Sequence, residues 1–452
     1  MKKCSLWVAI ALMMAMITVG CSNDDDAEAD VVTPAESEKP SEPQPLNPED
    51  LQLTRSEQDM VLESNDFAFN LFREVTAEYG ILGPGPCVPP EDYNLEVATG
   101  NNILSPISII YALGMLNIGA TGETQQQINK VLGFADTGAE GINTFCRKIL
   151  LRTLNSDPAT KLKIANNIYF NSSTGLTLNP TFLKLAKENY EAEPEIRNFA
   201  DGLTMDVINQ WCSDHTEKMI EKVLDEDSFD PFEVSYLLNA IYFKSNWAMK
   251  FDEAQTKDEV FEHTGGTENI TWSAMMHQEG KFRYLENETS QAVVLPYGNG
   301  SFAMTVLLPR EGKRIFDVLQ TLTAKSWTEQ YAWGGQEAIV DLKLPRFEAD
   351  TDIDLKGIMS RLGMPKAFTM AAEFPNFCDT NTFIDFMKQV AKIKVNEAGT
   401  EAAAVTIIGM DKSAHQPEPL YVTFHATRPF LYIISDQTTG AILFIGQYTG
   451  IG

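Results

Sequence analysis

The sequence predicts a mixed α+β fold, with helices dominating the first half of the chain and strands the second. Three observations support this. Amphipathic periodicity of the helical kind is concentrated early, alternating β-branched and aromatic runs are concentrated late, and strands and helices do not alternate as in a doubly wound sheet. The length allows two or three average domains, but 44% hydrophobic residues with few internal linkers fit one large domain.

The expected elements follow from these periodicities. Helical periodicity is found at residues 57–79, 108–116, 124–132, 141–154 and 205–223. Strand-like runs are found at residues 164–170, 236–243, 292–296, 302–308, 338–344, 421–424, 430–434 and 441–448. No internal repeat is visible in the sequence.

The N-terminus has the pattern of a targeting signal. Lys2 and Lys3 precede an apolar run at residues 6–19, which is short for a membrane span and is followed by Gly20 and Cys21. This pattern resembles a bacterial lipoprotein signal, so residues 1–20 are expected to be removed and Cys21 to attach the protein to a membrane through lipid. An ordinary secretory signal with an incidental cysteine is the alternative.

Residues 21–50 form an acidic, Pro- and Glu-rich segment. Residues 21–60 hold twelve acidic side chains against two basic ones, and such a segment buries too little apolar surface to fold, so it is expected to be a flexible tether. The acidic run after Cys21 is similar to export signals of Gram-negative surface lipoproteins. It predicts an outer-membrane lipoprotein that is exposed at the surface, with an extracellular or periplasmic location as the fallback.

Charge and cysteine content exclude some functions. The formal net charge of −28 argues against a nucleic-acid partner. The remaining cysteines are scattered, fit no zinc pattern and are expected to be buried thiols, although an export compartment also permits a disulfide. These residues are Cys87, Cys146, Cys212 and Cys378. Cys87 lies within a Gly- and Pro-rich stretch, residues 80–100, that is expected to be an inserted loop.

Enzyme motifs are absent from the sequence. The chain has five histidines and no His-Glu-x-x-His, Gly-x-Ser-x-Gly, P-loop or dinucleotide-binding motif. We therefore expect no catalytic residue, no metal site and no cofactor, although a Ser/His/Asp set assembled from distant residues is compatible with any sequence.

The segment at residues 395–406 has an ambiguous pattern. Its Glu and Ala residues favour a helix, whereas the β-branched run that begins at Val405 and the flexible Gly399 favour a strand. Read with a period of two, Thr400, Ala402 and Ala404 share one face with residues 406 and 408. Because this segment is compatible with both a helix and a strand, the pattern predicts a conformational switch.

Several motifs in a fixed order resemble the serpins, a family of protease inhibitors. These are Asn-Ile-Leu-Ser-Pro-Ile-Ser at residues 102–108, Gly-Ala-Thr-Gly-Glu-Thr at 119–124, Asn-Ala-Ile-Tyr-Phe-Lys-Ser-Asn-Trp at 239–247, Leu-Pro-Arg-Phe at 344–347, and the pair at 424–430 and 442–446. The resemblance implies a single serpin domain at residues 51–452. It implies a serpin fold of three β-sheets and about eight to nine helices, with an exposed reactive-centre loop at residues 397–419.

The resemblance also implies a mechanism. The protein would be a monomeric suicide substrate that traps a serine-type, or also a cysteine-type, endopeptidase when the cleaved loop inserts into the central sheet. The target enzyme would be trypsin-, elastase- or subtilisin-like. The implied hinge residues are Glu397, Gly399, Thr400, Glu401, Ala402, Ala403, Ala404 and Thr406.

A second set of residues is implied to control opening of the sheet. This sheet-opening cluster consists of Ser105, Ser108, Asn239, Gln389 and Trp247. Helix capping by the two serines is a simpler interpretation that is compatible with the first. Gln389 stands where the family often has a titrating histidine, so opening is expected to respond less to pH.

The scissile bond is less closely defined. The family spacing counted from Glu397 places it between Ser413 and Ala414, with Lys412 and Met410 as alternative sites of cleavage. A non-inhibitory serpin and a surface-anchored binding lipoprotein remain the alternative functions.

Overall fold

In the computed structural model, the described residues are 52–77, 99–263, 270–400 and 419–451. The chain divides into two units, Met1–Leu46 and Asn47–Gly452, and every described residue belongs to the second. The predicted α+β fold is confirmed. Within the described ranges, no helix is long and apolar enough to cross a membrane. Several predictions fall outside the described residues: the signal at 1–20, Cys21, the tether, most of the 80–100 segment, and all loop residues from Glu401 to 418.

Four of the five predicted helices are confirmed close to their expected positions. The helices are α1 (Arg55–Val75), α3 (Pro106–Gly119), α4 (Gly122–Leu132), α5 (Ala139–Asn155), α6 (Pro180–Tyr190), α7 (Thr204–His215), α8 (Ile315–Leu319), α9 (Ala324–Ser326) and α10 (Lys356–Leu362). The first of them starts with a capping box, in which Thr54 and Glu57 each bond the other's backbone N–H.

The predicted helix at residues 205–223 is wrong in its second half. α7 ends at His215, because Glu217 and Lys218 adopt positive φ angles of 51° and 64°. The side chain of Asn209 then accepts hydrogen bonds from the backbone N–H groups of Val223 and Leu224, at 2.8 and 2.9 Å. The chain therefore folds back on α7, and its apolar residues reach the same cluster without helical geometry.

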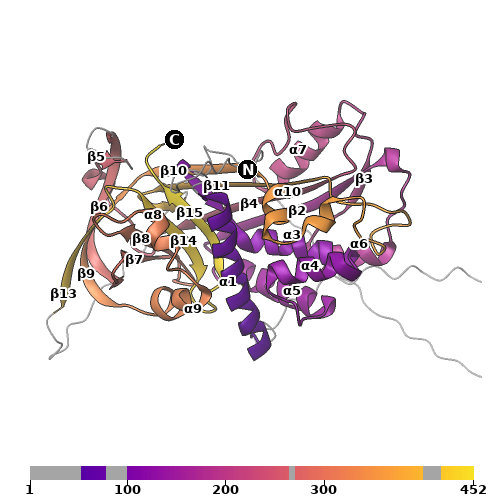
Figure 1. Cartoon of the computed structure of the whole chain (residues 1–452). Helices are drawn as coiled ribbons and strands as arrows, with labels where there is room; N and C mark the ends of the chain where they lie inside the picture. Colours follow the sequence, from indigo (N-terminus) through magenta and orange to yellow (C-terminus); the bar gives the residue numbers. More distant parts are fainter. Residues whose placement is uncertain (1–51, 78–98, 264–269, 401–418, 452) are drawn as a thin grey trace, which may run out of the picture. The chain divides into compact units, whose positions relative to one another are not determined.

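One sheet has six strands and carries the segment of interest. Its order is β10 (Phe347–Asp354), β11 (Phe386–Asn396), β12 (Gly399–Thr400), β4 (Ser235–Asn246), β2 (Lys161–Asn171) and β3 (Glu195–Arg197). β11 and β4 also pair directly and run parallel. Figure 1 shows these long strands with α7 on one side and α3 on the other.

The other sheet has nine strands. Its order is β1 (Asn102–Leu104), β15 (Ile442–Tyr448), β14 (Phe430–Asp436), β8 (Phe302–Pro309), β7 (Ser290–Tyr297), β6 (Ile270–Glu286), β9 (Gln336–Pro345) and β13 (Leu420–His425), with β5 (Lys257–Glu262) also paired to β6. The long β6 belongs to two parts of this sheet, because residues 283–286 pair with β7 while residues 275–284 pair with β9. Two of the three expected sheets are therefore hydrogen-bonded into one through β6.

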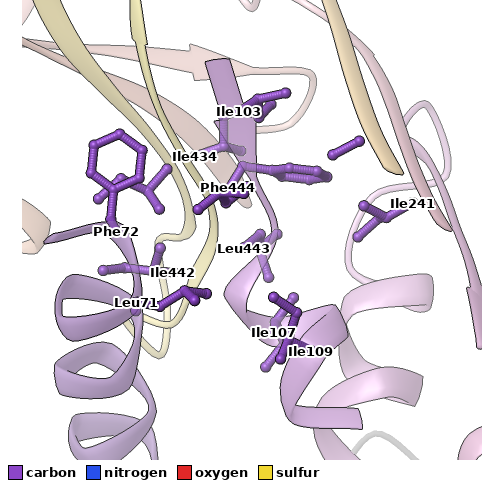
Figure 2. Packing of buried hydrophobic residues seen from close by; sticks show 14 of the residues in the cluster. Leu71, Phe72, Ile103, Ile107, Ile109, Ile241, Ile434, Ile442, Leu443 and Phe444 are labelled. Carbon is purple, nitrogen blue, oxygen red and sulfur yellow. The ribbon is translucent and has the colours of Figure 1, made fainter. Parts of the chain in front are cut away.

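The main core lies between the six-stranded sheet, α1, α3 and the C-terminal strands. Figure 2 shows Leu71 and Phe72 of α1 near Ile442 of β15, with Ile107 of α3 and Ile241 of β4 further along the same cluster. A second, smaller cluster lies beneath α7, on the other face of the sheet, and includes Tyr236, Leu238 and Ala240 of β4. Residues of β4 therefore alternate between two apolar environments, as expected for a strand covered on both faces.

Candidate functional site

At one end of the six-stranded sheet, β11 and β4 are no longer paired with each other. β11 and β4 are paired directly from Phe386 and Tyr236 up to Lys392 and Tyr242. Beyond that point the short strand β12 stands between them, and Thr400 pairs with Val395 on one side and Ser245 on the other. Two residues of the predicted hinge, Gly399 and Thr400, are thus already a strand inside the sheet.

Gly399 is required at this opening. Its φ of +140° is a conformation that other residues rarely adopt, and an added Cβ would lie 2.3 Å from the carbonyl oxygen of Ser245. Because the close neighbour is a backbone atom, it cannot rotate out of the way as a side chain could. Any side chain at this position would therefore push β12 away from β4.

The side chain of Thr400 points into the protein. Thr400 is 1% exposed, and its hydroxyl oxygen lies 3.0 Å from the hydroxyl oxygen of Tyr297, which is also buried. The ring of Tyr297 stacks on Trp247, with ring centroids 4.3 Å apart. Burial raises the pKa of Tyr297, so its phenol stays protonated and available for this hydrogen bond.

Backbone bonds hold the residues that lead into β12. The backbone N–H of Trp247 donates to the carbonyl oxygen of Ala398, and its indole N–H donates to that of Asn396, both at 2.9 Å. The N–H of Phe251 donates to the carbonyl oxygen of Glu397 at 3.0 Å. Trp247, predicted as part of the sheet-opening cluster, therefore lies at the hinge itself.

Glu397 anchors the hinge through its carboxylate. Arg346 donates from Nε to both carboxylate oxygens at 2.7 Å, and the hydroxyl of Thr256 donates to one of them. Burial acts to raise the pKa of Glu397, but the hydrogen bonds from Arg346 and Thr256 outweigh it and lower the pKa below its usual value. The side chain of Glu397 is 5% exposed, whereas that of Arg346 is about half exposed. The hinge residue of this ion pair is therefore the buried partner.

The four polar residues predicted below the opening lie together and are buried. Gln389 donates to the backbone oxygen of Ser105 at 3.1 Å and to the side chain of Asn239, and the N–H of Ser105 donates back to Gln389 at 3.0 Å. Asn239 in turn donates to the backbone oxygen of Ser108 at 3.1 Å and to the side chains of Ser108 and Asn166. This network joins β11, β4 and β2 to the start of α3.

Helix capping explains less of this cluster than the sequence suggested. Ser105 occupies the N-cap position of α3, but its side chain makes no capping bond and donates instead to the carbonyl oxygen of Leu443, at 2.8 Å. The capping interpretation of Ser105 is therefore wrong, and its hydroxyl ties α3 to β15.

The sequence did not identify four residues of this site, namely Tyr297, Arg346, Thr256 and Asn166. Asn166 could have been noticed, because two asparagines, at 166 and 167, interrupt the otherwise apolar run at residues 164–170. The other three come from separate strands or loops, and only the fold brings them to the hinge. Glu401, Ala402, Ala403, Ala404, Thr406, Met410, Lys412, Ser413 and Ala414 lie outside the described residues.

The cysteines and possible metal ligands give no sign of another site here. Cys146, Cys212 and Cys378 are buried and free, and burial raises the pKa of both Cys146 and Cys212 to about 12. Cys87 is not among the described residues. Across those residues, no group of three or more His, Cys, Asp or Glu side chains could hold a metal ion.

Comparisons with known proteins identify the family of this chain. The family model for serpins, described as serine protease inhibitors, matches residues 63–451. Human neuroserpin is 30% identical over 370 residues, covering 78% of this chain and 88% of neuroserpin. The solved structure of a thermophilic serpin, tengpin, in its native state is 26% identical with a TM-score of 0.73, covering 88% of this chain and 95% of tengpin. Human thyroxine-binding globulin, solved with its hormone, is 27% identical with a TM-score of 0.73, covering 87% of this chain and 98% of the globulin. The chain belongs to the serpin family, whose members are generally protease inhibitors rather than catalysts.

Proposed function

We propose that this serpin is a suicide-substrate inhibitor of serine-type endopeptidases, with cysteine-type enzymes as a second target class. A protease attacks the loop beyond Thr400 and forms an acyl-enzyme, as it would with any substrate. Cleavage frees the loop from its C-terminal attachment, and the loop then continues β12 down between β11 and β4 as an added strand. The acylated protease is carried along with the strand, and deacylation stalls.

The observation that carries this proposal is the register of β12. Thr400 pairs with both Val395 and Ser245 in antiparallel register. Each step forward along the loop from Thr400 would therefore move the pairing one residue back from Val395 on β11 and one residue back from Ser245 on β4. The inner-face rungs would combine Ala402 with Ile393 and Phe243, Ala404 with Ala391 and Ile241, and Ile408 with Met387 and Leu237. All six partners belong to the buried apolar cluster, so the apolar loop residues match their destination.

The one polar position on the inner face between residues 402 and 408 also has a matching destination. In the same register, Thr406 would arrive between Gln389 and Asn239, the two residues at the centre of the polar cluster. A threonine hydroxyl can both donate and accept there, whereas an apolar side chain would leave those amides with one fewer partner. The polar position in the loop therefore coincides with the polar rung of the sheet.

The outer face matches as well. Glu401 would pair between Lys394 and Lys244, which are not buried, and opposite charges on neighbouring strands are favourable. Val405 would lie between Val390 and Ala240, which contribute to the apolar cluster beneath α7. The charge and hydrophobicity of these loop residues thus match their neighbours on β11 and β4 at both faces of the sheet.

The energy available is sufficient for the proposed trap. Each net backbone hydrogen bond contributes roughly 1 kcal/mol, and about ten bonds beyond those replaced would release on the order of 10 kcal/mol. One donor of a protease oxyanion hole is worth about 3 kcal/mol, so insertion can disturb that site and stop deacylation. The uncleaved protein must then be kinetically trapped above its most stable state.

The test is a titration of trypsin-, elastase- and subtilisin-type enzymes with the purified protein. We expect one enzyme molecule to be consumed per inhibitor, with a covalent complex that survives detergent. Mass spectrometry of the released C-terminal peptide identifies the cut, which we propose lies between Ser413 and Ala414, with Lys412 and Met410 as alternatives. Steady turnover of the loop with no complex for any enzyme would refute inhibition and leave a non-inhibitory serpin or a surface-anchored binding protein.

We further propose that the inhibitor acts as a monomer at the surface of a Gram-negative outer membrane, attached by lipid on Cys21. The charged start, the apolar run and the Gly20–Cys21 pair support this. Metabolic labelling with a fatty acid, compared between the native chain and Cys21→Ala, tests it. Label that persists in Cys21→Ala would contradict the proposed attachment site.

A further inference from the structure

The end of the six-stranded sheet opposite β12, which we call its base, is held closed by the segments that lead into β4 and β11. The two strands are paired directly down to Tyr236 and Phe386. Immediately before them, the hydroxyl of Ser235 donates to the carbonyl oxygen of Phe383 at 2.9 Å and accepts from the N–H of Asp385 at 3.3 Å. Ser235 is completely buried, so these bonds link the two segments beyond the last pair of the strands.

Two carboxyl groups extend this link. Glu233 precedes β4 and Asp385 precedes β11, and a side-chain hydrogen bond joins them. Asp385 also accepts from the N–H of Val234 and from Lys356 at the start of α10, both at 3.2 Å. A hydrogen bond between two carboxyl groups requires a proton on one of them. We name Glu233 and Asp385 the carboxyl pair.

The proton of the carboxyl pair belongs to Glu233. Burial raises the pKa of Glu233 to about 8, and the hydrogen bond with Asp385 and the charge of that carboxylate act in the same direction. Burial also acts to raise the pKa of Asp385, but its hydrogen-bond donors outweigh burial and lower that pKa below its usual value. At neutral pH a neutral Glu233 therefore donates to an ionised Asp385 across the base of the sheet.

Charged and titratable side chains lie on the elements around the carboxyl pair. They are Asp225 and Asp230 of the loop before β4, Tyr236 of β4, Asp352 and Asp354 of β10, Lys356 of α10 and Lys388 of β11. Lys388 is bonded to Asp352 at 2.7 Å. Burial raises the pKa of Tyr236, so its phenol stays neutral. Lys356 contacts the pair through Asp385, which favours ionisation of Asp385 and leaves the proton on Glu233.

Completion of the proposed added strand requires the base to open. In the register of β12, Gly409 would reach the level of Phe386 and Tyr236, which are the last direct pair. A strand placed between two neighbours moves them apart by about 4.8 Å. A hydrogen bond cannot span the widened gap, so the bond within the carboxyl pair must break at the last step of insertion.

Ionisation of Glu233 favours this separation. In the closed sheet its pKa is about 8, whereas in water the pKa has its ordinary value of 4.5. Between these values opening releases a proton, and the opening equilibrium rises with pH by up to ~10-fold per unit. The stabilisation of the closed base is therefore complete below about pH 4.5 and is lost as the pH rises through about 8.

We propose that Glu233 and Asp385 are positioning residues, whose shared proton holds the base of the sheet closed and makes the last step of loop insertion easier at alkaline than at mildly acidic pH. The effect on insertion rests on the proposed function, whereas the closure of the base does not. Gln389, at the centre of the same sheet, cannot titrate, so the carboxyl pair gives this sheet a pH response that its centre lacks.

The test is hydrogen exchange of the intact protein at pH 6.0 and pH 8.5, expressed as protection relative to an unstructured peptide at each pH. We expect protection of residues 234–238 and 386–390 to be about tenfold lower at pH 8.5, less than full linkage because Glu233 is partly exposed. Glu233→Gln keeps an N–H donor for Asp385 and cannot ionise, so its protection should be the same at both pH values. Glu226→Gln, an exposed position on the same loop, is the matched control and should keep the pH effect.

Equal protection of these residues at both pH values in the native chain, or an undiminished pH effect in Glu233→Gln, would overturn the proposal. Asp385→Asn is a second check, because removal of the neighbouring charge should move the loss of protection to lower pH. An unchanged midpoint in this variant would exclude Asp385 as the partner.

Trapping of a protease is measured separately. At pH 8.5 the native chain should need fewer inhibitor molecules per protease trapped than Glu233→Gln, and at pH 6.0 the two should be equal. Equal numbers at pH 8.5 would contradict the link between the carboxyl pair and insertion. A chain that shows the exchange effect but traps no protease would retain the carboxyl pair and refute the proposed function, so the two failures are distinguishable.

Discussion

The reactive-centre loop leaves the fold through buried residues and returns to it through exposed ones. At its N-terminal end Glu397, Gly399 and Thr400 are all buried and are tied to β4, β11 and the segment between β4 and β5. At its C-terminal end β13 lies at a sheet edge, and of its six side chains only that of Phe424 is fully buried. The first end belongs to the sheet that the loop would complete, whereas the second is a removable attachment.

This difference has a direct physical consequence. Two residues of the added strand are already paired, so insertion does not have to begin with an unfavourable first contact. The remaining slot is closed by seven direct β11–β4 pairs, from Phe386–Tyr236 to Lys392–Tyr242, which must separate as the strand advances. In the proposed mechanism, the attachment at β13 prevents that advance until a protease cuts the loop.

The largest expected effect comes from a charge at the buried end. Thr400→Arg places a guanidinium in a site that is 1% exposed and contains the Tyr297 hydroxyl, so insertion should stall while cleavage continues. Detergent-resistant complex should disappear on gels and the protein should be consumed as a substrate. Thr400→Ser retains the hydroxyl and serves as the control. A stable Arg-variant complex would show that the register of β12 is irrelevant to trapping.

The next effect concerns the exposed end. Phe424→Ala removes the one fully buried side chain of β13 and should reduce the local stability of that strand by about 3 kcal/mol. Hydrogen exchange of residues 420–425 should accelerate strongly, and the uncleaved inhibitor should lose activity faster on storage. Tyr421→Ala, at a side chain that is 68% exposed, should change neither measurement. Equal effects from both substitutions would mean that burial does not hold β13.

A smaller effect is expected at the hydroxyl pair. Tyr297→Phe leaves the buried Thr400 hydroxyl without its partner, at a cost of about 1–2 kcal/mol to the docked hinge. More inhibitor molecules should then be cleaved per protease trapped, by a few fold. Adding Thr400→Val removes the second hydroxyl and should restore most of the loss, as measured in a double-mutant cycle. Additive losses would show that the two hydroxyl groups do not act as a pair.

The smallest effect is the pH response of the hinge anchor. Since the pKa of Glu397 is lowered in the fold, its stabilisation is complete above about pH 5 and is lost as the pH falls through the folded-state pKa, below 4.5. With Arg346 half exposed, we expect about 1 kcal/mol. Protection of residues 396–400, relative to an unstructured peptide at each pH, should fall below pH 4 in the native chain, while Glu397→Gln should show the reduced protection already at pH 6. An unchanged exchange rate in Glu397→Gln would exclude the anchor.

The sequence predicted the elements better than it predicted their contacts. Strands such as β8 and β14 are almost wholly buried, and their continuous apolar runs are unambiguous. β6 was not predicted, because its centre reads His-Gln-Glu-Gly-Lys, and those side chains face solvent or neighbouring charges in the sheet. The helix predicted at 205–223 is too long for a different reason. Two separate segments, α7 and the residues that follow it, contribute apolar side chains to one cluster, so the sequence pattern resembles that of a single helix.

The hinge itself illustrates the same limit. Small residues at alternate positions predict which face of the loop can enter a sheet, but they contain no information on the register. That register depends on the pairing of Thr400 with Val395 and Ser245, residues separated from it by very different lengths of chain. Likewise, the partner of Glu397 is Arg346, fifty-one positions away, and only the fold brings the two together.

The central claim is that the uncleaved protein is not in its most stable form. The most direct measurement is the melting temperature before and after one cut in the loop between residues 410 and 415. Completion of the sheet by about 10 kcal/mol should raise the melting temperature by at least about 10 °C. A cleaved protein that melts at the same temperature as the intact one would contradict the account.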